Sequence, residues 1–249
     1  MATITAHCLI KNEENFVWYA IKSVVDFVDK IIVFDTGSTD KTVELIKKLA
    51  EEYPEKIIFE EKGSCDKVRH THLRQEMLKK TNTDWFMILD GDEVWTKRGA
   101  EEAIKIISEN KVNIIETFFY ECVGDIYHTH IKSGYKTVRF VKCGGVQWKG
   151  EYGIDTLVSQ KTQQGAISQN DAVLKNKFWH LTHLRRSDKD DDEYSSGGNR
   201  KFKRRLTYFM IGKTIVEPVP EVFQNKNDYR MNVMTSFVNF VALIFSSNK

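Results

Sequence analysis

The chain has 249 residues, 41% hydrophobic and 29% charged, a composition typical of a soluble globular protein with a substantial core. Lys and Arg number 37 against 35 Asp and Glu, and this net charge of +2 argues against a dedicated nucleic-acid binder, which is usually strongly basic. The four cysteines form no C-x-x-C pair, which argues against structural zinc and indicates a reducing compartment. The N-terminus lacks the basic and apolar regions of a secretory signal, so we expect a cytoplasmic protein.

The first 95 residues are expected to alternate strands with helices. Short apolar runs predict strands, and apolar residues at helical spacing predict helices. We expect Asn12 to cap the first helix, and Ser38, Thr39 or Asp40 to cap the second. Such alternation is typical of crossover units in a parallel sheet. The expected strands are 3–10, 30–35, 56–61 and 84–90, and the expected helices are 12–28, 37–53 and 66–80.

The rest of the chain has a less regular pattern. A helix is expected at 100–110, and strands are expected at 112–123, 135–143 and 177–184. Their irregular connections predict antiparallel or edge strands added to the parallel sheet. The apolar segment 231–245 is shorter than the roughly 20 residues of a spanning helix. It predicts a core or docking helix, with peripheral membrane contact as the alternative.

Polar residues follow three of the predicted strands, in the segments 11–14, 35–38 and 90–92. The carboxyl ends of parallel strands share one edge of a sheet, and ligands bind beyond that edge. Asp90 and Asp92 form a D-x-D pair that could direct both carboxylates to one hard cation. Asp-Gly is also common turn chemistry, so this pattern alone leaves a cation site and a plain turn open.

Four segments in this order carry a resemblance to a known family: CLIKNEEN, VFDTGSTDKT, DKVRHTHLRQEM and DWFMILDGDE. The chain resembles the family 2 glycosyltransferases, inverting enzymes of the GT-A fold, over about 3–95 and more loosely over 135–185. The resemblance implies an α/β, Rossmann-like sandwich with a mostly parallel central sheet and added antiparallel strands. It implies a single domain, 1–249, with a nucleotide-sugar half (1–95), an acceptor half (96–210) and a C-terminal helical segment (211–249).

The resemblance also implies roles in binding a nucleotide-diphosphate sugar. Asp35 would contact the base or ribose, and Asp90 and Asp92 would bind ribose and a divalent cation, Mn²⁺ or Mg²⁺. In the family an acidic residue and an Arg-Asn pair precede the D-x-D strand. Asp66 and Arg69 match these positions, whereas His70 replaces the Asn. The remaining residues implied for the nucleotide-sugar pocket are Ile10, Asn12, Glu14 and Gly91.

An inverting transfer needs a base near the anomeric carbon to deprotonate the acceptor hydroxyl. The resemblance continues at TVRFVK (137–142) and VQWKGEYGIDTLV (146–158), where the family commonly shows a His-Glu step. Asp155 takes the Glu position and Ile154 replaces the His. Asp155 is therefore the first candidate for the base and Glu151 the second, the alternative being that each is a solvated loop acid.

Two histidines lie in FWHLTHL (178–184). Residues three apart on a strand point to opposite faces, so His180 and His183 are not expected to share one metal. The family often places a His after the acceptor region that closes on the metal or diphosphate. His180 fits this place best and His183 is the reserve, and a hydrogen-bonded packing residue is the alternative. Arg185, Arg186 and the basic cluster 200–205 would form a lid over the diphosphate or a solvated surface loop.

These features predict a metal-dependent glycosyltransferase acting on a nucleotide-diphosphate sugar, a UDP-sugar first, with a glycan, lipid-linked or protein acceptor. A degenerate GT-A module that binds a nucleotide sugar or a partner is the main alternative, supported by the missing His-Glu step. A phosphatase fits FMILDGDEV, but that superfamily places the motif on its first strand, whereas three predicted strands precede it here. A sugar nucleotidyltransferase would need a glycine-rich loop after the first strand, and CLIKNEEN is not one.

Overall fold

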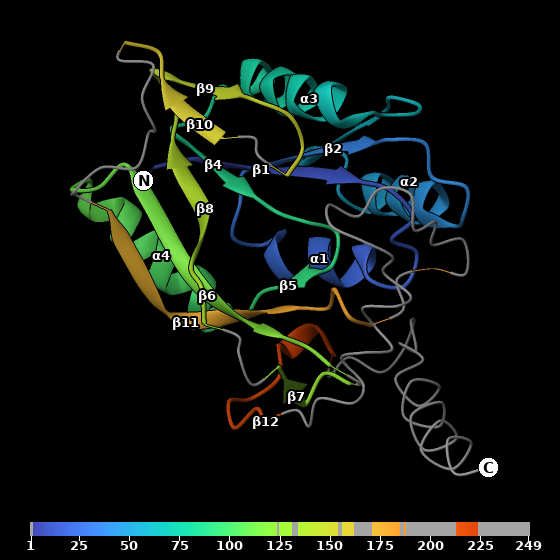
Figure 1. Cartoon of the computed structure of the whole chain (residues 1–249), viewed down its shortest axis with the longest axis vertical. Helices are drawn as coiled ribbons and strands as arrows, with labels where there is room; N and C mark the ends of the chain where they lie inside the picture. The colour runs from blue at the N-terminus through green and yellow to red at the C-terminus, as the bar shows by residue number, and fades with distance from the viewer. Residues whose placement is uncertain are drawn as a thin grey trace.

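The fold is built around one curved sheet with helices on both of its faces (Figure 1). The computed structural model describes residues 2–123, 125–130, 134–153, 156–161, 171–184, 187 and 213–223. The sheet has eight strands in the order β3-β2-β1-β4-β8-β6-β11-β5. It crosses both predicted halves of the chain, and the division into halves stays a prediction.

The first part of the chain forms the parallel side of the sheet, as predicted. β1 pairs in parallel with β2 and β4, and β2 pairs in parallel with β3. β1, β2 and β4 are short runs of apolar residues that are largely buried on both faces, as parallel strands require, whereas the outer strand β3 leaves Ile58 43% exposed. The elements are β1 (Ile4–Ile10), α1 (Val17–Val24), β2 (Lys30–Asp35), α2 (Thr42–Glu52), β3 (Ile57–Glu61), α3 (Lys67–Lys80) and β4 (Trp85–Ile88).

The second part adds antiparallel pairings to the same sheet. β8 lies between β4 and β6 and is antiparallel to both, whereas β11 is parallel to β6 and antiparallel to β5. The α/β class with a mostly parallel sheet and added antiparallel strands is thereby confirmed. The elements are β5 (Glu93–Val94), α4 (Lys97–Glu109), β6 (Ile114–Glu121), β7 (His128–Thr129), β8 (Thr137–Lys142), β9 (Val146–Lys149), β10 (Thr156–Ser159), β11 (Ala172–His180), β12 (Lys213–Thr214) and the 3-10 turn Glu221–Phe223.

Side chains of alternate residues along each strand enter different core layers. Val33 of β2 lies in the cluster that α1, α2 and α4 cover, together with Leu45 and Ala103. Phe34, the next residue, lies in the cluster that α3 covers through Leu73 and Met77. The β9-β10 hairpin lies beside α3, as the upper part of Figure 1 shows. The sheet is therefore covered on both faces, and its carboxyl edge is left to bind ligands.

Three local predictions were wrong. α2 begins at Thr42 rather than at residue 37, because Asp35 folds residues 36–41 into a loop. Asn12 does not cap α1, whose N-cap residue is Phe16 without a side-chain cap. Asn12 instead adopts a positive φ of 54° and binds the β2-α2 loop. The strand predicted at 177–184 begins earlier and ends at His180.

Several predictions fall outside the described residues. They concern Ile154, Asp155, Arg185, Arg186, the cluster 200–205 and the apolar segment 231–245. In the described part of the chain, no helix combines the length and the hydrophobicity needed to span a bilayer.

A buried histidine in β1 links the stability of this fold to pH. His7 stacks on Phe86 with ring centroids 4.8 Å apart, and its Nε2 lies 2.6 Å from Thr81 Oγ1. The Thr81 hydroxyl donates to the Met77 carbonyl oxygen, so it accepts the His7 Nε2–H. Burial, assisted by the nearby charge of Arg74, lowers the pKa of His7 to about 3. The folded protein therefore holds His7 neutral.

Because the unfolded chain binds a proton at His7 below about pH 6.5 and the folded chain does not, stability falls as the pH falls from 6.5 toward 3. Between pH 7 and pH 5 the loss due to His7 is about 2 kcal/mol. Urea unfolding at both pH values should show this loss in the parent and a correspondingly smaller loss in His7→Leu. The exposed His72 supplies the control His72→Gln, which should keep the parent pH dependence. Equal losses in His7→Leu and the parent would contradict the assignment.

Candidate active site

Three strand ends meet at one edge of the sheet. β1 lies between β2 and β4, so Ile10, Asp35 and the turn after Ile88 come together although they are far apart in the sequence. This turn is the Asp90-Gly91-Asp92 segment, and it is closed by a hydrogen bond from Glu93 N to Asp90 O of 3.1 Å. The expectation that polar strand ends gather at one edge is confirmed.

Asp35 and Asn12 are engaged in building the β2-α2 loop. One carboxylate oxygen of Asp35 accepts from Gly37 N and Ser38 N, each at 2.9 Å, and the other accepts from the Ser38 hydroxyl. Asn12 Oδ1 accepts from Thr39 N at 2.8 Å, and Asn12 N donates to Ser38 Oγ at 2.8 Å. These contacts fix the loop that would border a nucleotide. The predicted direct contact of Asp35 with a base or ribose stays a prediction.

Asp66 and Arg69 are likewise engaged locally. Asp66 is the N-cap of α3 and accepts from Arg69 N at 2.7 Å. The Arg69 guanidinium donates to the carbonyl oxygens of Ser64 and Lys62, at 2.9 and 2.6 Å. The two residues therefore hold the β3-α3 loop. His70, at the divergent position, packs against Tyr152 with ring centroids 4.4 Å apart.

The arginine of α3 that faces the acidic turn is Arg74. Its Nη2 lies 3.6 Å from Asp90 Oδ1, and its guanidinium lies 5.0 Å from the centre of the Trp148 ring. Arg74 was not among the site residues expected from the sequence, whereas Arg69 was, and the binding role expected of Arg69 stays a prediction. Arg74 lies within the quoted segment DKVRHTHLRQEM, but only the rotation of α3 on the sheet shows which arginine points toward Asp90.

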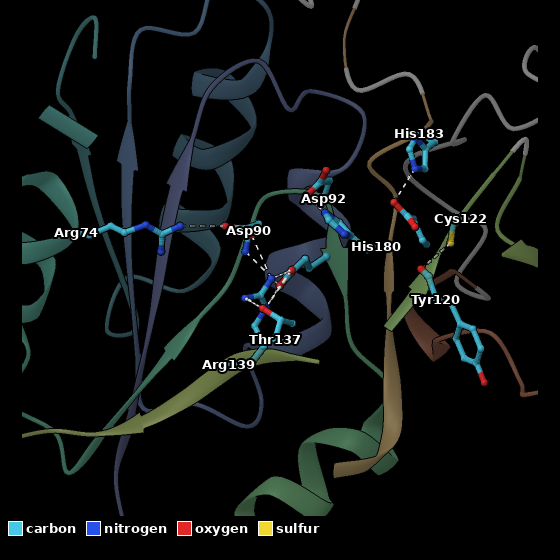
Figure 2. Close-up of polar contacts among 11 residues, drawn as sticks. Arg74, Asp90, Asp92, Tyr120, Cys122, Thr137, Arg139, His180 and His183 are labelled. Atoms are coloured by element: carbon cyan, nitrogen blue, oxygen red, sulfur yellow. Dashed lines mark hydrogen bonds and ion pairs between the residues drawn. The ribbon is translucent and has the colours of Figure 1, made fainter. Parts of the chain in front are cut away.

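Asp90 is also held by Arg139, a buried arginine of β8 (Figure 2). Arg139 Nη2 lies 3.4 Å from Asp90 Oδ2, and the same guanidinium binds both carboxylate oxygens of Glu93. Its Nη1 donates to Thr137 Oγ1 and to the Val138 carbonyl oxygen, each at 2.9 Å. Arg139 therefore ties β8 to both ends of the Asp90–Glu93 turn.

The electrostatics of the turn follow from burial and these two arginines. Burial opposes ionisation of Asp90, but the charges of Arg139 and Arg74 outweigh it, so the pKa of Asp90 is lowered. Glu93 is fully buried, and burial raises its pKa to about 7 although the Arg139 charge acts in the opposite direction. Asp90, whose side chain is 36% exposed, is thus the ionised group that a ligand can reach.

His180 meets Asp92 because β11 pairs with β5. His180 stands opposite Glu93 in that pairing, and Leu181 N donates to Asp92 O at 2.8 Å. His180 Nε2 lies 3.4 Å from Asp92 Oδ1. Burial alone would lower the pKa of His180, but the neighbouring carboxylates, Asp92 first, raise it above its ordinary value. The buried Nδ1 of His180 has no hydrogen-bond partner in the described structure.

The side chains at the turn fit a divalent cation only in part. Among the described residues, no three His, Cys, Asp or Glu side chains stand close enough together to hold a metal ion. Asp92 Oδ1 and His180 Nε2 offer an oxygen and a nitrogen donor side by side. Asp90 is shared with two guanidinium groups. Oxygens of a bound diphosphate would supply further ligands.

Gly91 is required by the close approach of the turn to the β1-α1 connection. A Cβ at this position would lie 2.8 Å from Glu13 Cγ and 3.0 Å from Ile10 Cγ2. The turn that places Asp90 and Asp92 is therefore packed against the end of β1. The Asp90-Gly91-Asp92 segment is therefore a turn, and this is compatible with its also being a binding site.

The other predicted acids have different surroundings. Glu14 accepts from Lys41 N at 3.2 Å and from Ser187 Oγ at 2.8 Å, so it joins the α1 region to the β2-α2 loop and to Ser187. Glu151 is half-buried in a segment that Tyr152 fastens to α3 through Lys67 O, at 2.9 Å. Glu121, which the sequence analysis did not single out, ends β6 and binds His183 Nε2 at 2.8 Å. His183 is therefore not the histidine beside Asp92.

The fold and this edge define a class: an α/β sheet whose carboxyl edge presents acidic groups around a strand-end turn, as in nucleotide-sugar enzymes. The model of glycosyl transferase family 2 matches residues 9–182, and the chain belongs to that family. The resemblance in the sequence is thereby confirmed. The chain has the GT-A fold, as expected of that family.

SunS and TarS are similar to this chain at low sequence identity. Glycosyltransferase SunS of Bacillus subtilis (strain 168) is 28% identical over 125 residues, which are 50% of this chain and 27% of SunS. The structure of S. aureus TarS has a TM-score of 0.51 at 12% identity, covering 72% of this chain and 37% of TarS. TarS 1–349 in complex with UDP gives 0.51 at 12% identity, covering 71% and 60%. The chain thus spans about a quarter of SunS and little more than a third of TarS.

Removing the Arg139 charge should leave Glu93 buried without its partner. Arg139→Met is expected to lower the free energy of unfolding by about 3–5 kcal/mol, the usual cost of breaking a buried ion pair. Glu93→Met combined with Arg139→Met should recover most of this loss, because neither charge then remains buried. Urea unfolding measures both. The matched control is Lys136→Met, which breaks the exposed pair with Glu116 and should cost no more than about 1 kcal/mol. A loss in Arg139→Met no larger than in Lys136→Met would refute this role.

Proposed function

We propose that the chain is a metal-dependent inverting glycosyltransferase that uses a nucleotide-diphosphate sugar. The observation that carries the proposal is the meeting of Asp90, Asp92 and His180 at the carboxyl end of β4. His180 is far from the turn in the sequence, and only the pairing of β11 with β5 brings it there. A carboxylate and an imidazole at the ligand-binding edge of a glycosyltransferase sheet suit a cation that carries a diphosphate.

The chemistry requires charge neutralisation at the leaving group. As the bond from the anomeric carbon to the diphosphate breaks, negative charge grows on the diphosphate oxygens. A divalent cation, when bound, would neutralise that charge as a Lewis acid, and Asp92 and His180 would hold it. Arg74 supplies a second, permanent positive charge at the same edge, because its guanidinium reaches Asp90. We propose that Arg74 also binds the diphosphate.

The donor nucleotide would lie beside the β2-α2 loop that Asp35 and Asn12 hold in place. UDP is the first nucleotide to test, since TarS has the same fold and has been crystallised with it. The acceptor would be a glycan, a lipid-linked glycan or a protein. Asp155 and Glu151 stay the proposed bases from the sequence. A cytoplasmic site of action, with membrane contact through the C-terminal segment, also stays a proposal.

A degenerate module that binds a nucleotide sugar without turnover is the second candidate. Its support is Ile154, which stands where the family commonly has the His of its His-Glu step. Such a protein would bind the donor nucleotide and release none from a nucleotide sugar.

A ligand that binds the native state stabilises it, by about 2.7 kcal/mol when the ligand concentration is 100 Kd. The melting temperature rises as a result. UDP with Mn²⁺ should raise the melting temperature of the parent by several degrees, and UDP without Mn²⁺ should raise it less. Asp92→Asn should lose the Mn²⁺-dependent part. Asp84→Asn is the matched control, because Asp84 lies before β4 and binds Thr3 away from the turn. If neither UDP nor GDP shifts the melting temperature of the parent in either condition, the proposed function fails.

A further inference from the structure

A carboxylate–imidazole pair stands beside the predicted donor site and has no role in the proposal above. Glu121 Oε1 lies 2.8 Å from His183 Nε2, and each side chain is 19% exposed. The hydrogen bond from His183 is the main influence on Glu121 and lowers the pKa of its carboxyl group. An ionised carboxylate only accepts hydrogen bonds, so Nε2 carries the proton of the neutral imidazole. The other ring nitrogen, Nδ1, then presents a lone pair.

The fold holds this pair in a fixed place. Glu121 is the last residue of β6, and His183 lies in a turn closed by a hydrogen bond of 2.8 Å from Leu184 N to Leu181 O. Both leucines of the turn are buried, which anchors it to the core. Within the described residues, the contact with Glu121 is the only polar contact of the His183 ring. The imidazole is therefore oriented and its Nδ1 remains available.

The pair lies next to the residues proposed to hold the diphosphate. Glu121 stands beside His180 in the parallel pairing of β6 with β11, and neighbouring strands are about 4.8 Å apart. Figure 2 shows His180 beside Asp92 and His183 beyond the end of β11, and the charge of His180 acts on the Glu121 carboxylate that His183 binds. The anomeric carbon of a donor lies next to its diphosphate. An acceptor that reaches that carbon from the β6 side would pass this pair.

We propose that His183 is the base that deprotonates the acceptor, and that Glu121 is the positioning residue that fixes its tautomer. In this step the acceptor O–H bond breaks and its proton passes to His183 Nδ1. The acceptor oxygen forms a bond to the anomeric carbon, while the bond from that carbon to the diphosphate breaks and its electron pair leaves with the diphosphate. The same logic of nucleophile, imidazole and orienting carboxylate operates in other group-transfer enzymes.

This inference rests on the proposed function and sets His183 against the two carboxylate bases expected from the sequence, Asp155 and Glu151. Asp155 lies outside the described residues, and Glu151 lies beside α3. Among the described residues, the charged and titratable groups around the pair are His130 and His180, which act on Glu121, and Cys122 and Tyr135, which Glu121 influences. Tyr135 is 61% exposed and packs edge-on against Phe119, which also contacts the His180 ring. An exposed aromatic ring next to the pair is a suitable surface for an acceptor.

The experiment measures nucleotide release from UDP-glucose, UDP-N-acetylglucosamine and GDP-mannose with Mn²⁺, with water as the acceptor, in parallel with UDP binding by calorimetry. His183→Gln should lower the rate on the order of 100-fold or more, the range of a general base, with UDP affinity unchanged. Glu121→Gln should lower the rate less than His183→Gln does. UDP affinity should also be unchanged in Glu121→Gln, because Glu121 acts through His183.

A second pair of the same kind supplies the control. His128 Nδ1 lies 2.8 Å from Asp125 Oδ1 on the β7 side of the fold, so His128→Gln removes an equivalent contact and should keep the parent rate. A parent that binds UDP, with an unchanged rate in His183→Gln and a large loss in Asp155→Asn, would overturn this inference and leave the proposed function intact. Lost UDP binding in His183→Gln would also overturn it, because His183 would then be a donor-binding residue. If the parent binds no nucleotide, or binds it but releases none from any of the three donors, both the proposed glycosyltransferase activity and the proposed role of His183 as the base are refuted.

Discussion

The buried guanidinium of Arg139 is the interaction on which the acidic edge depends. Asp90, Asp92 and Glu93 lie within four residues of sequence, and three carboxylates so close together would repel one another if none were neutralised. Arg139, 8% exposed, binds Glu93 through two oxygens and reaches Asp90 with the same group. Burying a charge costs several kcal/mol unless its hydrogen bonds are satisfied, and here Thr137 and the Val138 carbonyl accept the remaining donors. The turn after β4 can therefore be both acidic and buried.

Once Arg139 fixes the turn, the geometry of its neighbours follows. Glu93 begins β5, and the pairing of β5 with β11 brings His180 to Asp92. β11 in turn runs parallel to β6, which places Glu121 beside His180. Gly91 allows the turn to pack against Glu13 and Ile10 at the end of β1. The residues of the edge come from seven different strands or their ends, and the turn that Arg139 binds links them.

Periodic patterns predicted the parallel side of this fold because its elements are determined locally. The apolar runs of β1, β2 and β4 need burial on both faces, and that requirement is visible in sequence.

The loops were less predictable, since side-chain contacts override helix propensity there. Asp35 and Asn12 hold residues 36–41 out of the helix that the pattern predicts. Arg74 was not singled out from the sequence for a similar reason. Arg69 and Arg74 lie on one helix, and only its packing against β9 and the sheet decides which of them faces Asp90. In the sequence, Glu121 is an ordinary polar residue at the end of a strand. Its partner His183 is apparent only from the structure, where the turn after β11 places the imidazole beside the end of β6.

The structure also separates the two aspartates that the D-x-D pattern presents as equivalent. Asp90 lies between two permanent cations, Arg74 and Arg139, which satisfy its charge. Asp92 faces His180, whose charge depends on its proton and whose nitrogens are also metal donors. A divalent cation can displace a proton from an imidazole, whereas it cannot displace the charge of a guanidinium. This difference favours Asp92 with His180 as the ligands of a cation, and it favours Asp90 as the carboxylate that orders Arg74 and accepts hydrogen bonds from the donor. The glycine between them then joins two carboxylates with different partners and different tasks.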